Sequence, residues 1–315
     1  MTYDRCLVLG GYGFLGTHIS EKLLANGIAV RIFDRPGAGS GSSFQFPDAS
    51  MLEIVEGDFT NQEDIERAVD GCDCCVHLVT TTLPFTSNEN MMFDIESNLM
   101  GSVQLMKQAA KAKFKKLVYI SSGGTVYGPS KSDKIAETHP TSPLSSYGIT
   151  KLAVEKYLSL YQELHGLRSV ALRLSNPFGE RQRIKSLQGA VAVFVGAAVQ
   201  DRELQIWGDG SVVRDYIYVT DVANAVLKAL EYEGLEKVFN VGSGHGQSLL
   251  DVVKVVEETV GKKLKIVFQA GRSVDASRNV LDISKASELL RWTPEIDFPT
   301  GVQKMASWLD QELRR

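Results

Sequence analysis

Features that mark membrane and nucleic-acid-binding proteins are missing from this sequence. It has no run of 18 or more apolar residues, which is roughly the length that a membrane-spanning helix needs. Its formal net charge is −4, whereas nucleic acids and membrane surfaces are bound by basic surfaces. Residues 1–5 lead directly into an apolar strand pattern, so we expect no signal peptide. The sequence therefore predicts a cytoplasmic protein that binds neither nucleic acid nor membrane.

Cysteine is also scarce, with only four residues: Cys6, Cys72, Cys74 and Cys75. Three of them fall within residues 72–75, which suggests a metal knuckle, but a zinc site needs a second ligand cluster and none is evident. The apolar segment 74–79 is instead typical of a buried strand, in which cysteine behaves as a small hydrophobe. We therefore expect free thiols in a reducing compartment, and no metal site.

What is present predicts an α/β protein. The chain has 315 residues, of which 43% are hydrophobic and 23% charged, as in soluble globular proteins. Apolar runs without polar alternation, typical of strands covered on both faces, alternate with helical patterns as far as residue 175. We predict a doubly wound parallel sheet in residues 1–175 and a smaller substrate-binding lobe in residues 176–315. A strand at 237–241 is expected to return to the main sheet, so the two parts are interleaved. Helices are expected at about 88–112, 146–164, 189–199, 219–231, 248–260 and 300–313.

A glycine-rich turn follows the first predicted strand. Gly10, Gly13 and Gly16 permit a tight turn, close approach of backbone to a pyrophosphate and close packing of the next helix on the strand. The second strand ends at Asp34, 18 residues beyond Gly16, where an acid can accept hydrogen bonds from an adenosine ribose. This carboxylate favours NAD over NADP, although Arg35 beside it can accept a 2′-phosphate. The alternative reading of Asp34 is a solvated acid at a strand end.

Polar residues gather where the later strands end, and ligands bind at this edge of such sheets. Asp58 follows the third strand and is placed to meet the adenine amino group. A polar loop at 80–90 follows the fourth strand, and the hydroxyls of Ser121, Ser122 and Thr125 follow the fifth. A second glycine-rich loop at 242–246 resembles a phosphate cradle, but we interpret it as a structural turn before a packing helix.

Tyr147 and Lys151 are four residues apart on a predicted helix, so their side chains project from one face. A Lys ammonium beside a Tyr hydroxyl favours the phenolate and lowers the Tyr pKa, so that the Tyr can take a proton from an alcohol and return it. The alternative is simple packing beside a solvated charge.

Together, the glycine turn, Asp34, the strand-end serines and the Tyr147–Lys151 pair resemble the extended short-chain dehydrogenase/reductase family, especially its nucleotide-sugar 4-epimerases. The resemblance runs from Leu9 to Pro294 and implies a Rossmann-type fold. It also implies a substrate site for a nucleotide diphosphate sugar, because Arg offers a bidentate fork to phosphate oxygens. The residues expected to bind this substrate are Asn176, Arg214, Arg272 and Asn279. Each Arg could instead be a surface charge or half of an ion pair, and the small Asn279 leaves room for a 2-acetamido group.

The resemblance implies an NAD-dependent epimerase that interconverts UDP-linked sugars at C4 through a transient 4-keto intermediate. Tyr147 is the expected base, and Lys151 its partner. Relatives carry a Ser or Thr hydroxyl where this chain has Gly123, so Ser122 or Thr125 must replace it, with a slight preference for Thr125. The glycines at 123 and 124 also lack the Asp-Glu pair of dehydratases, which disfavours loss of water.

The resemblance further implies a homodimer in which the helices near 88–112 and 146–164 form a four-helix bundle. Two alternatives stay open: a nucleotide-sugar oxidoreductase or decarboxylase on the same scaffold, and a non-catalytic NAD-binding regulator. The residues expected to contact NAD are Gly10, Gly13, Phe14, Leu15, Gly16, Asp34, Arg35, Asp58, Phe59, Leu78, Thr80, Asn98, Ser121, Tyr147 and Lys151.

Overall fold

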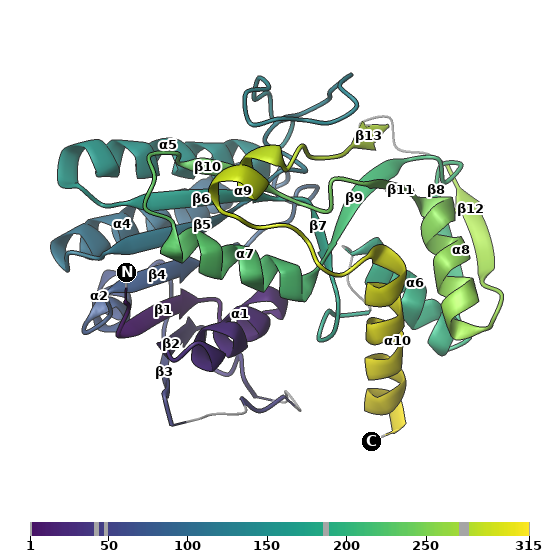
Figure 1. Ribbon diagram of the computed structural model, residues 1–315, viewed down its shortest axis with the longest axis horizontal. Helices are drawn as coiled ribbons and strands as arrows, with labels where there is room; N and C mark the ends of the chain where they lie inside the picture. The colour runs from purple at the N-terminus through teal and green to yellow at the C-terminus, as the bar shows by residue number, and fades with distance from the viewer. Residues whose placement is uncertain (1, 41–43, 47–49, 185–188, 271–276, 315) are drawn as a thin grey trace. The chain divides into compact units, whose positions relative to one another are not determined.

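The computed structural model describes residues 2–40, 44–46, 50–184, 189–270 and 277–314 (Figure 1). Two compact units are interleaved along the chain. The first comprises Met1–Gly128, Pro140–Arg173 and Ala223–Phe239, and the second comprises Pro129–His139, Leu174–Val222 and Asn240–Arg315. Each is described separately below.

The first unit is built on a seven-stranded sheet in the order β10-β6-β5-β4-β1-β2-β3. The pairs β1–β2, β2–β3, β1–β4 and β4–β5 are parallel. The strand order reverses between β1 and β4, and in doubly wound sheets this switch point marks the ligand crevice. The strands are β1 Arg5–Leu9, β2 Ala29–Asp34, β3 Leu52–Glu56, β4 Cys74–His77, β5 Lys116–Ser122, β6 Ser169–Leu174 and β10 Val238–Val241.

Helices cover both faces of this sheet, with α1 and α7 on the near face in Figure 1 and α2, α4 and α5 on the far face. On the far side, Leu105, Val154 and Leu158 join Leu7 and Leu117 in one buried apolar core. The expected helix near 88–112 is interrupted by a π-helical segment, a feature that often occurs at functional sites. The helices are α1 Phe14–Ala25, α2 Gln62–Val69, α3 Met91–Asp94, the π-helix η1 Ile95–Met100, α4 Gly101–Lys111, α5 Ser146–His165 and α7 Val219–Glu231.

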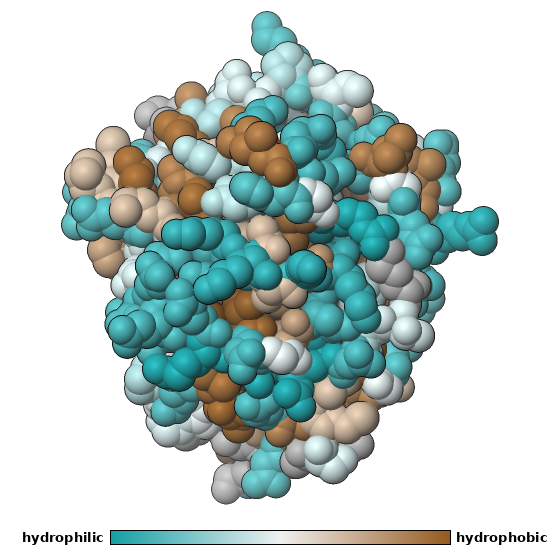
Figure 2. All heavy atoms as spheres, turned by 90° about the vertical axis from the view of Figure 1, so that its left-hand side faces the viewer, coloured by the Kyte–Doolittle hydropathy of each residue, from teal (hydrophilic) through white to brown (hydrophobic). Residues whose placement is uncertain are grey.

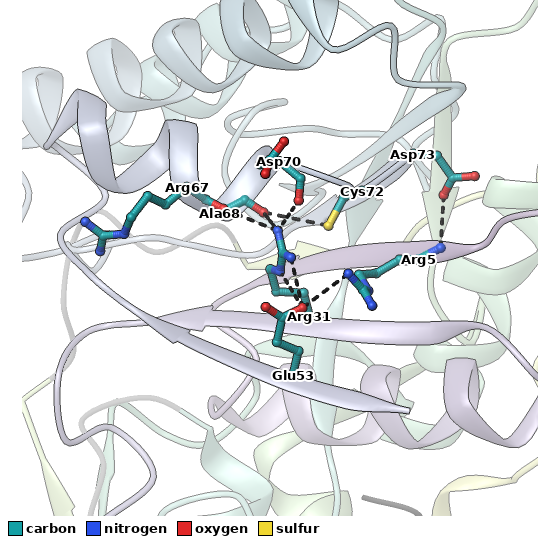
Figure 3. Close-up of polar contacts among 8 residues, drawn as sticks. All are labelled: Arg5, Arg31, Glu53, Arg67, Ala68, Asp70, Cys72 and Asp73. Carbon is teal, nitrogen blue, oxygen red and sulfur yellow. Dashed lines mark hydrogen bonds and ion pairs between the residues drawn. The ribbon is translucent and has the colours of Figure 1, made fainter. Parts of the chain in front are cut away.

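A buried arginine on β2 ties this sheet to helix α2 (Figure 3). Arg31 of β2 is only 7% exposed. Its guanidinium donates to the carbonyls of Arg67 and Ala68, in the last turn of α2, at 3.2 and 3.0 Å. It also forms an ion pair of 2.9 Å with Glu53 of β3. It therefore satisfies carbonyls that a helix end leaves without partners.

The second unit has a small sheet centred on β9 and a separate pair, β8 with β12. Strand β9 pairs in parallel with β7 and β13 and antiparallel with β11. Helices α6, α8 and α10 share an apolar core that includes Phe178, Val195, Val252 and Met305. The elements are β7 Asn176–Phe178, α6 Ala190–Val199, β8 Glu203–Trp207, β9 Val213–Tyr218, β11 Gly246–Ser248, α8 Leu249–Val260, β12 Lys265–Gln269, β13 Arg278–Asn279, α9 Ser284–Leu289 and α10 Phe298–Arg314.

The cysteines are buried free thiols, and β4, which carries Cys74 and Cys75, is buried along its whole length. The interpretation of this segment as a buried strand is therefore confirmed. In the described part of the chain, no group of three or more His, Cys, Asp or Glu side chains is arranged to hold a metal. Over the same residues, no helix has the length and apolar character required to cross a membrane.

Candidate active site

The glycine turn after β1 has room only for glycine where it packs against the first turn of α1. Gly10 has φ +81°, and its N–H donates to the Phe33 carbonyl at 2.8 Å. A Cβ on Gly16 would lie 2.2 Å from the Gly10 oxygen and 2.6 Å from the Gly11 Cα, a separation that atoms do not tolerate. The turn and the first turn of α1 therefore pack backbone against backbone, as a dinucleotide-binding turn requires.

The N-terminus of α1 is suited to a phosphate. Its N-cap, Gly13, makes no side-chain capping bond, and the first turn of this fully described helix holds no acidic side chain. The leading N–H groups, which include those of Phe14 and Leu15, are left to a ligand, and the helix dipole favours a negative charge there. These residues thus fit the pyrophosphate of NAD.

Asp34 lies beside this turn. Its carboxylate accepts from the backbone N–H of Tyr12 at 3.0 Å and from that of Arg35 at 2.9 Å, which fixes the acid where a ribose can reach it, while Arg35 itself is exposed. Asp58 accepts two bonds of 2.8 Å from the backbone and hydroxyl of Thr60. Phe59 is buried, and its ring lies 5.0 Å from that of His77, so its side chain is part of the core.

The end of β4 lies against the glycine turn across the switch point. Leu78 donates its N–H to the Leu9 carbonyl at 3.1 Å, and exposed Thr80 follows it. Asn98, within the π-helix, accepts from the Thr81 N–H at 2.9 Å and donates to the Thr81 hydroxyl at 2.9 Å. Asn98 therefore holds the loop after β4 and does so through the irregular helical turn.

Tyr147 and Lys151 lie in the first turns of α5. The Ser145 hydroxyl caps this helix by accepting from the Gly148 N–H at 3.2 Å. The Lys151 ammonium is buried, donates to the Ile120 carbonyl at 2.8 Å, and lies 5.6 Å from the centre of the Tyr147 ring. The pair is thus packed against the carboxyl end of β5.

The electrostatics of this pair correct one prediction. We expected Lys151 to lower the pKa of Tyr147, but burial raises the pKa of Tyr147 to about 12, and the effect that opposes burial is a hydrogen bond with Ser122. Burial also lowers the pKa of Lys151 to about 8, because desolvation disfavours the charged form of each group.

The three hydroxyls after β5 have different surroundings. Ser122 bonds to the Tyr147 phenol. Ser121 donates to Glu155 at 2.5 Å. The Thr125 hydroxyl is buried without a hydrogen-bond partner among the described residues, beside Gly148, where an added Cβ would lie 3.3 Å from the Thr125 Cβ. Of Ser122 and Thr125, the two candidates for the hydroxyl missing at Gly123, only Ser122 is thus bonded to Tyr147.

Three of the four predicted substrate residues lie together in the second unit. In the sheet register, Asn279 is the partner of Arg214 and Asn176 is the partner of Tyr216. Register partners, and residues two apart on a strand, share a face, so Asn176, Arg214 and Asn279 occupy one face of this sheet. The Asn176 amide donates to the Asp215 carbonyl at 2.9 Å, and the Arg214 guanidinium donates to the Val213 carbonyl at 2.9 Å. Arg272 lies outside the described residues.

The second glycine-rich loop surrounds a carboxylate of the protein itself. Asp215, fully buried, accepts from the N–H groups of Ser243 and Gly244 at 2.7 and 3.1 Å and from the Ser243 hydroxyl at 2.8 Å. A loop of this kind offers the same donors to a phosphate. Here these donors bind Asp215 and so hold β9 in place. This agrees with the interpretation of the loop at 242–246 as a structural turn.

Comparison with known proteins identifies the family. The NAD dependent epimerase/dehydratase family matches residues 6–242 of the chain. The chain belongs to this family.

Individual epimerase/dehydratase proteins match nearly the whole chain. A dTDP-4-dehydro-6-deoxyglucose reductase of Escherichia coli is 33% identical over 305 residues, which cover 95% of both chains. A UDP-glucose 4-epimerase of Mycolicibacterium smegmatis is 32% identical over 302 residues, 95% of this chain and 96% of that protein. The crystal structure of the Thermotoga maritima UDP-glucose 4-epimerase with UDP-glucose is similar with a TM-score of 0.91 at 31% identity, covering 98% of this chain and 99% of that one.

Several predictions about the epimerase/dehydratase chain are thereby confirmed: its family, its Rossmann-type α/β fold, its NAD cofactor, and its enzyme class as an NAD-dependent sugar-nucleotide epimerase. The matches do not test the roles of individual site residues or the domain boundary, which stay predictions. The cytoplasmic location also stays a prediction.

Two buried carboxylates of this epimerase/dehydratase escaped the sequence reasoning. Glu155 lies one helical turn beyond Lys151 and forms an ion pair of 2.7 Å with Arg173. Asp94, at the end of α3, is 0% exposed. The spacing of Tyr147, Lys151 and Glu155 at intervals of four was a usable signal for Glu155, whereas Asp94 carries no local pattern that marks it.

Proposed function

We propose that this chain interconverts UDP-linked sugars at C4 by reversible oxidation through a 4-keto intermediate. The observation that carries the proposal is the packing of Tyr147 and Lys151 against the end of β5, with the Ser122 hydroxyl bonded to the Tyr147 phenol. A positioned phenol can take up and return the proton of a sugar hydroxyl. The same unit carries the glycine turn and Asp34, which fit NAD.

In the proposed mechanism, residues 10–16 and Asp34 would hold NAD, which would supply a reversible hydride acceptor for C4 of the sugar. Tyr147 accepts the proton of the 4-OH, and it returns a proton to the same oxygen when the 4-keto intermediate is reduced at the opposite face of C4. Ser122 donates to the phenol oxygen and favours its ionised form. Lys151, a cation beside the Tyr147 ring, supplies positive charge where the phenolate forms.

The proposed substrates are UDP-glucose and UDP-galactose or their N-acetyl forms. Asn279 is 3% exposed and is the register partner of Arg214, so a short amide lies next to the proposed diphosphate contact. This short side chain supports room for a 2-acetamido group. Asn279→Tyr should reduce kcat/KM for UDP-N-acetylglucosamine more than for UDP-glucose.

The proposed assembly is a homodimer through α3, η1, α4 and α5. Apolar side chains are exposed along these helices: Met91 53%, Met92 64%, Phe93 47%, Met100 60%, Ile149 57% and Leu160 46%. Apolar patches among hydrophilic side chains are also visible on the face drawn in Figure 2. Contiguous apolar surface on a protein often marks an interface.

The test is to incubate the purified protein with UDP-glucose, UDP-N-acetylglucosamine and UDP-glucuronate separately, without added cofactor. A C4 epimer seen by NMR, formed by wild-type protein and not by Tyr147→Phe, supports the proposal. Tyr157→Phe, on the same helix and 39% exposed, is the matched control and should stay active.

A second candidate is a nucleotide-sugar reductase, because an E. coli dTDP-4-dehydro-6-deoxyglucose reductase is as similar to this chain as the epimerases are. Accumulated NADH in the same reactions, or consumption of added NADH with a 4-keto sugar nucleotide, favours this alternative. Released CO2 indicates a decarboxylase. Absence of turnover with every substrate, while NAD is bound, indicates a non-catalytic NAD-binding protein.

A further inference from the structure

Asp94 is a fully buried carboxylate that collects hydrogen bonds from three separate segments. One oxygen accepts from the Thr82 hydroxyl, in the loop after β4, and from the Asn98 amide at 2.9 Å. The other accepts from the Ser146 hydroxyl at 2.7 Å and the Thr150 hydroxyl at 2.8 Å, both on α5. Hydrogen bonds to a buried carboxylate are stronger than those between neutral groups. Asp94 therefore joins the β4 loop, the π-helix and α5.

The two contacts on α5 flank the Tyr147–Lys151 pair in sequence. Ser146 directly precedes Tyr147, and Thr150 directly precedes Lys151. Because both hydroxyls meet one carboxylate oxygen, they fix the rotation of the first helical turns about the α5 axis. The α5 backbone is held further by the Asn88 side chain, which accepts from the Ser146 N–H at 2.8 Å. The direction in which Tyr147 and Lys151 project is thus set by these contacts.

The charge of Asp94 also acts on Lys151. All four donors to Asp94 are neutral, so none of them offsets its charge. Glu155, the other carboxylate near Lys151, is already paired with Arg173. The groups that act on Lys151 or are acted on by it are Asp94, Glu155 and His77, and its ammonium also lies near the rings of Tyr119 and Tyr147. Asp94 raises the pKa of Lys151 more than Glu155 does, against the larger lowering by burial.

We propose that Asp94 is a positioning residue: it fixes the face of α5 that presents Tyr147 and Lys151, and it supplies the buried negative charge that keeps Lys151 cationic. The kinetic part of this proposal rests on the proposed function. The effect on the charge of Lys151 does not, and it can be measured on protein without NAD or substrate.

The charge effect is tested by urea unfolding of NAD-free protein between pH 6 and pH 10. In the folded state Lys151 has a pKa of about 8, below its ordinary 10.5, so the unfolded chain binds more protons in this window and stability rises with pH. Asp94→Asn removes a charge that raises the pKa of Lys151. The increase of unfolding free energy with pH should therefore begin at a lower pH in this variant. Lys116, another buried lysine, is present in every variant and cancels in the comparison.

Two controls isolate Lys151. In a Lys151→Met background, Asp94→Asn should no longer change the pH at which the unfolding free energy begins to increase. Thr150→Val removes one hydrogen bond but keeps the Asp94 charge. The unfolding free energy of this variant should therefore begin to increase at the same pH as in wild type, even if the variant is less stable. An unchanged onset in Asp94→Asn, or the same displacement in the Lys151→Met background, overturns the charge effect.

The positioning effect is tested by kinetics with the double variant Ser146→Ala, Thr150→Val, which also serves if Asp94→Asn does not fold. Its kcat should fall by about tenfold or more with little change in KM, because small misplacements of reacting groups are costly. In this double variant, the acidic and basic limbs of the profile of kcat/KM against pH should stay at the same pH as in wild type. In Asp94→Asn both limbs should move to lower pH, since the charge raises the pKa of Tyr147 and of Lys151.

An unchanged kcat in the double variant overturns the positioning effect. A wild-type protein that epimerises no sugar nucleotide contradicts the proposed function instead, and the unfolding experiment then decides on Asp94 by itself.

Discussion

The Ser122 hydroxyl is bonded to the phenol of Tyr147, and this bond opposes the burial that raises the Tyr147 pKa to about 12. Thr125, three residues further on, has a buried hydroxyl for which the described chain offers no partner. The structure thus separates the two hydroxyls that the sequence left as alternatives, and the separation can be tested directly.

We expect Ser122→Ala to lower kcat/KM by about 10²-fold or more and to move its acidic limb to higher pH, because the variant loses the bond that favours the phenolate. Thr125→Val, its matched control, should keep the limb in place. Both variants are compared with wild type by measuring kcat/KM against pH with the sugar nucleotide that wild type converts fastest. A limb displaced by Thr125→Val and not by Ser122→Ala would show that Thr125 is the partner of Tyr147.

The glycine turn permits a graded test of cofactor binding. A Cβ at Gly16 would lie 2.2 Å from the Gly10 oxygen, whereas one at Gly13 would lie 3.1 Å from it. We expect Gly16→Ala to lose NAD and much of its stability, because backbone must move, and Gly13→Ala to fold with weaker NAD binding. Mass spectrometry of NAD released from denatured protein, together with thermal unfolding, measures both. Equal retention of NAD in the two variants contradicts this account.

The buried ion pair of Glu155 and Arg173, 3% and 5% exposed, supports the strand and helix beneath Tyr147 and Lys151. Removing one partner leaves a buried charge uncompensated, which costs about 3–5 kcal/mol. We expect Glu155→Gln to lose stability in this range by urea unfolding. Glu163→Gln is the control, since Glu163 is exposed and pairs with Lys237 at the surface, where pairs contribute little. A similar loss in both variants would argue against a special role for the buried pair.

Lys116 provides a pH prediction away from the site. Burial lowers its pKa to about 8, from an ordinary 10.5, and its ammonium donates to the Tyr232 carbonyl at 2.6 Å. The pKa of Lys116 is lower in the folded state than in the unfolded state. Burial of the protonated lysine therefore lowers the stability of the protein below about pH 8, and this loss becomes smaller as the pH rises to 10.5. Lys116→Met should reduce the slope of unfolding free energy against pH between 8 and 10 by up to about 1.4 kcal/mol per pH unit. A slope equal to that of wild type would contradict the assignment.

The proposed dimer is tested by placing a charge on its apolar face. Met100 is 60% exposed on the π-helix, and Leu235, outside these helices, is 88% exposed. We expect Met100→Lys to sediment as a monomer at a concentration at which wild type and the Leu235→Lys control are dimers, because a buried unpaired charge is costly. A monomeric wild-type protein would remove the basis of the prediction.

The sequence alone determined much of the fold of the first unit and the outline of its site. Strands β1 and β4 consist mainly of apolar residues, and the turn from Gly10 to Gly16 is one contiguous pattern. Such features depend on neighbours within a few residues, so they can be read without the fold. Asp34 and the Tyr147–Lys151 pair were found in the same way, by their distance from a recognisable element.

Tertiary structure decided the surroundings of those residues. Asp94 meets Ser146 and Thr150 across 52 and 56 positions, and the loop at 242–246 encloses Asp215 from 28 positions away. No local pattern records such pairs. The pKa of Tyr147 was predicted wrongly for the same reason: desolvation depends on everything packed around the phenol, and a spacing of four residues specifies only one neighbour. Local sequence therefore indicated the groups that we propose to carry the chemistry, whereas long-range packing determined the shifts of their pKa values and their orientation.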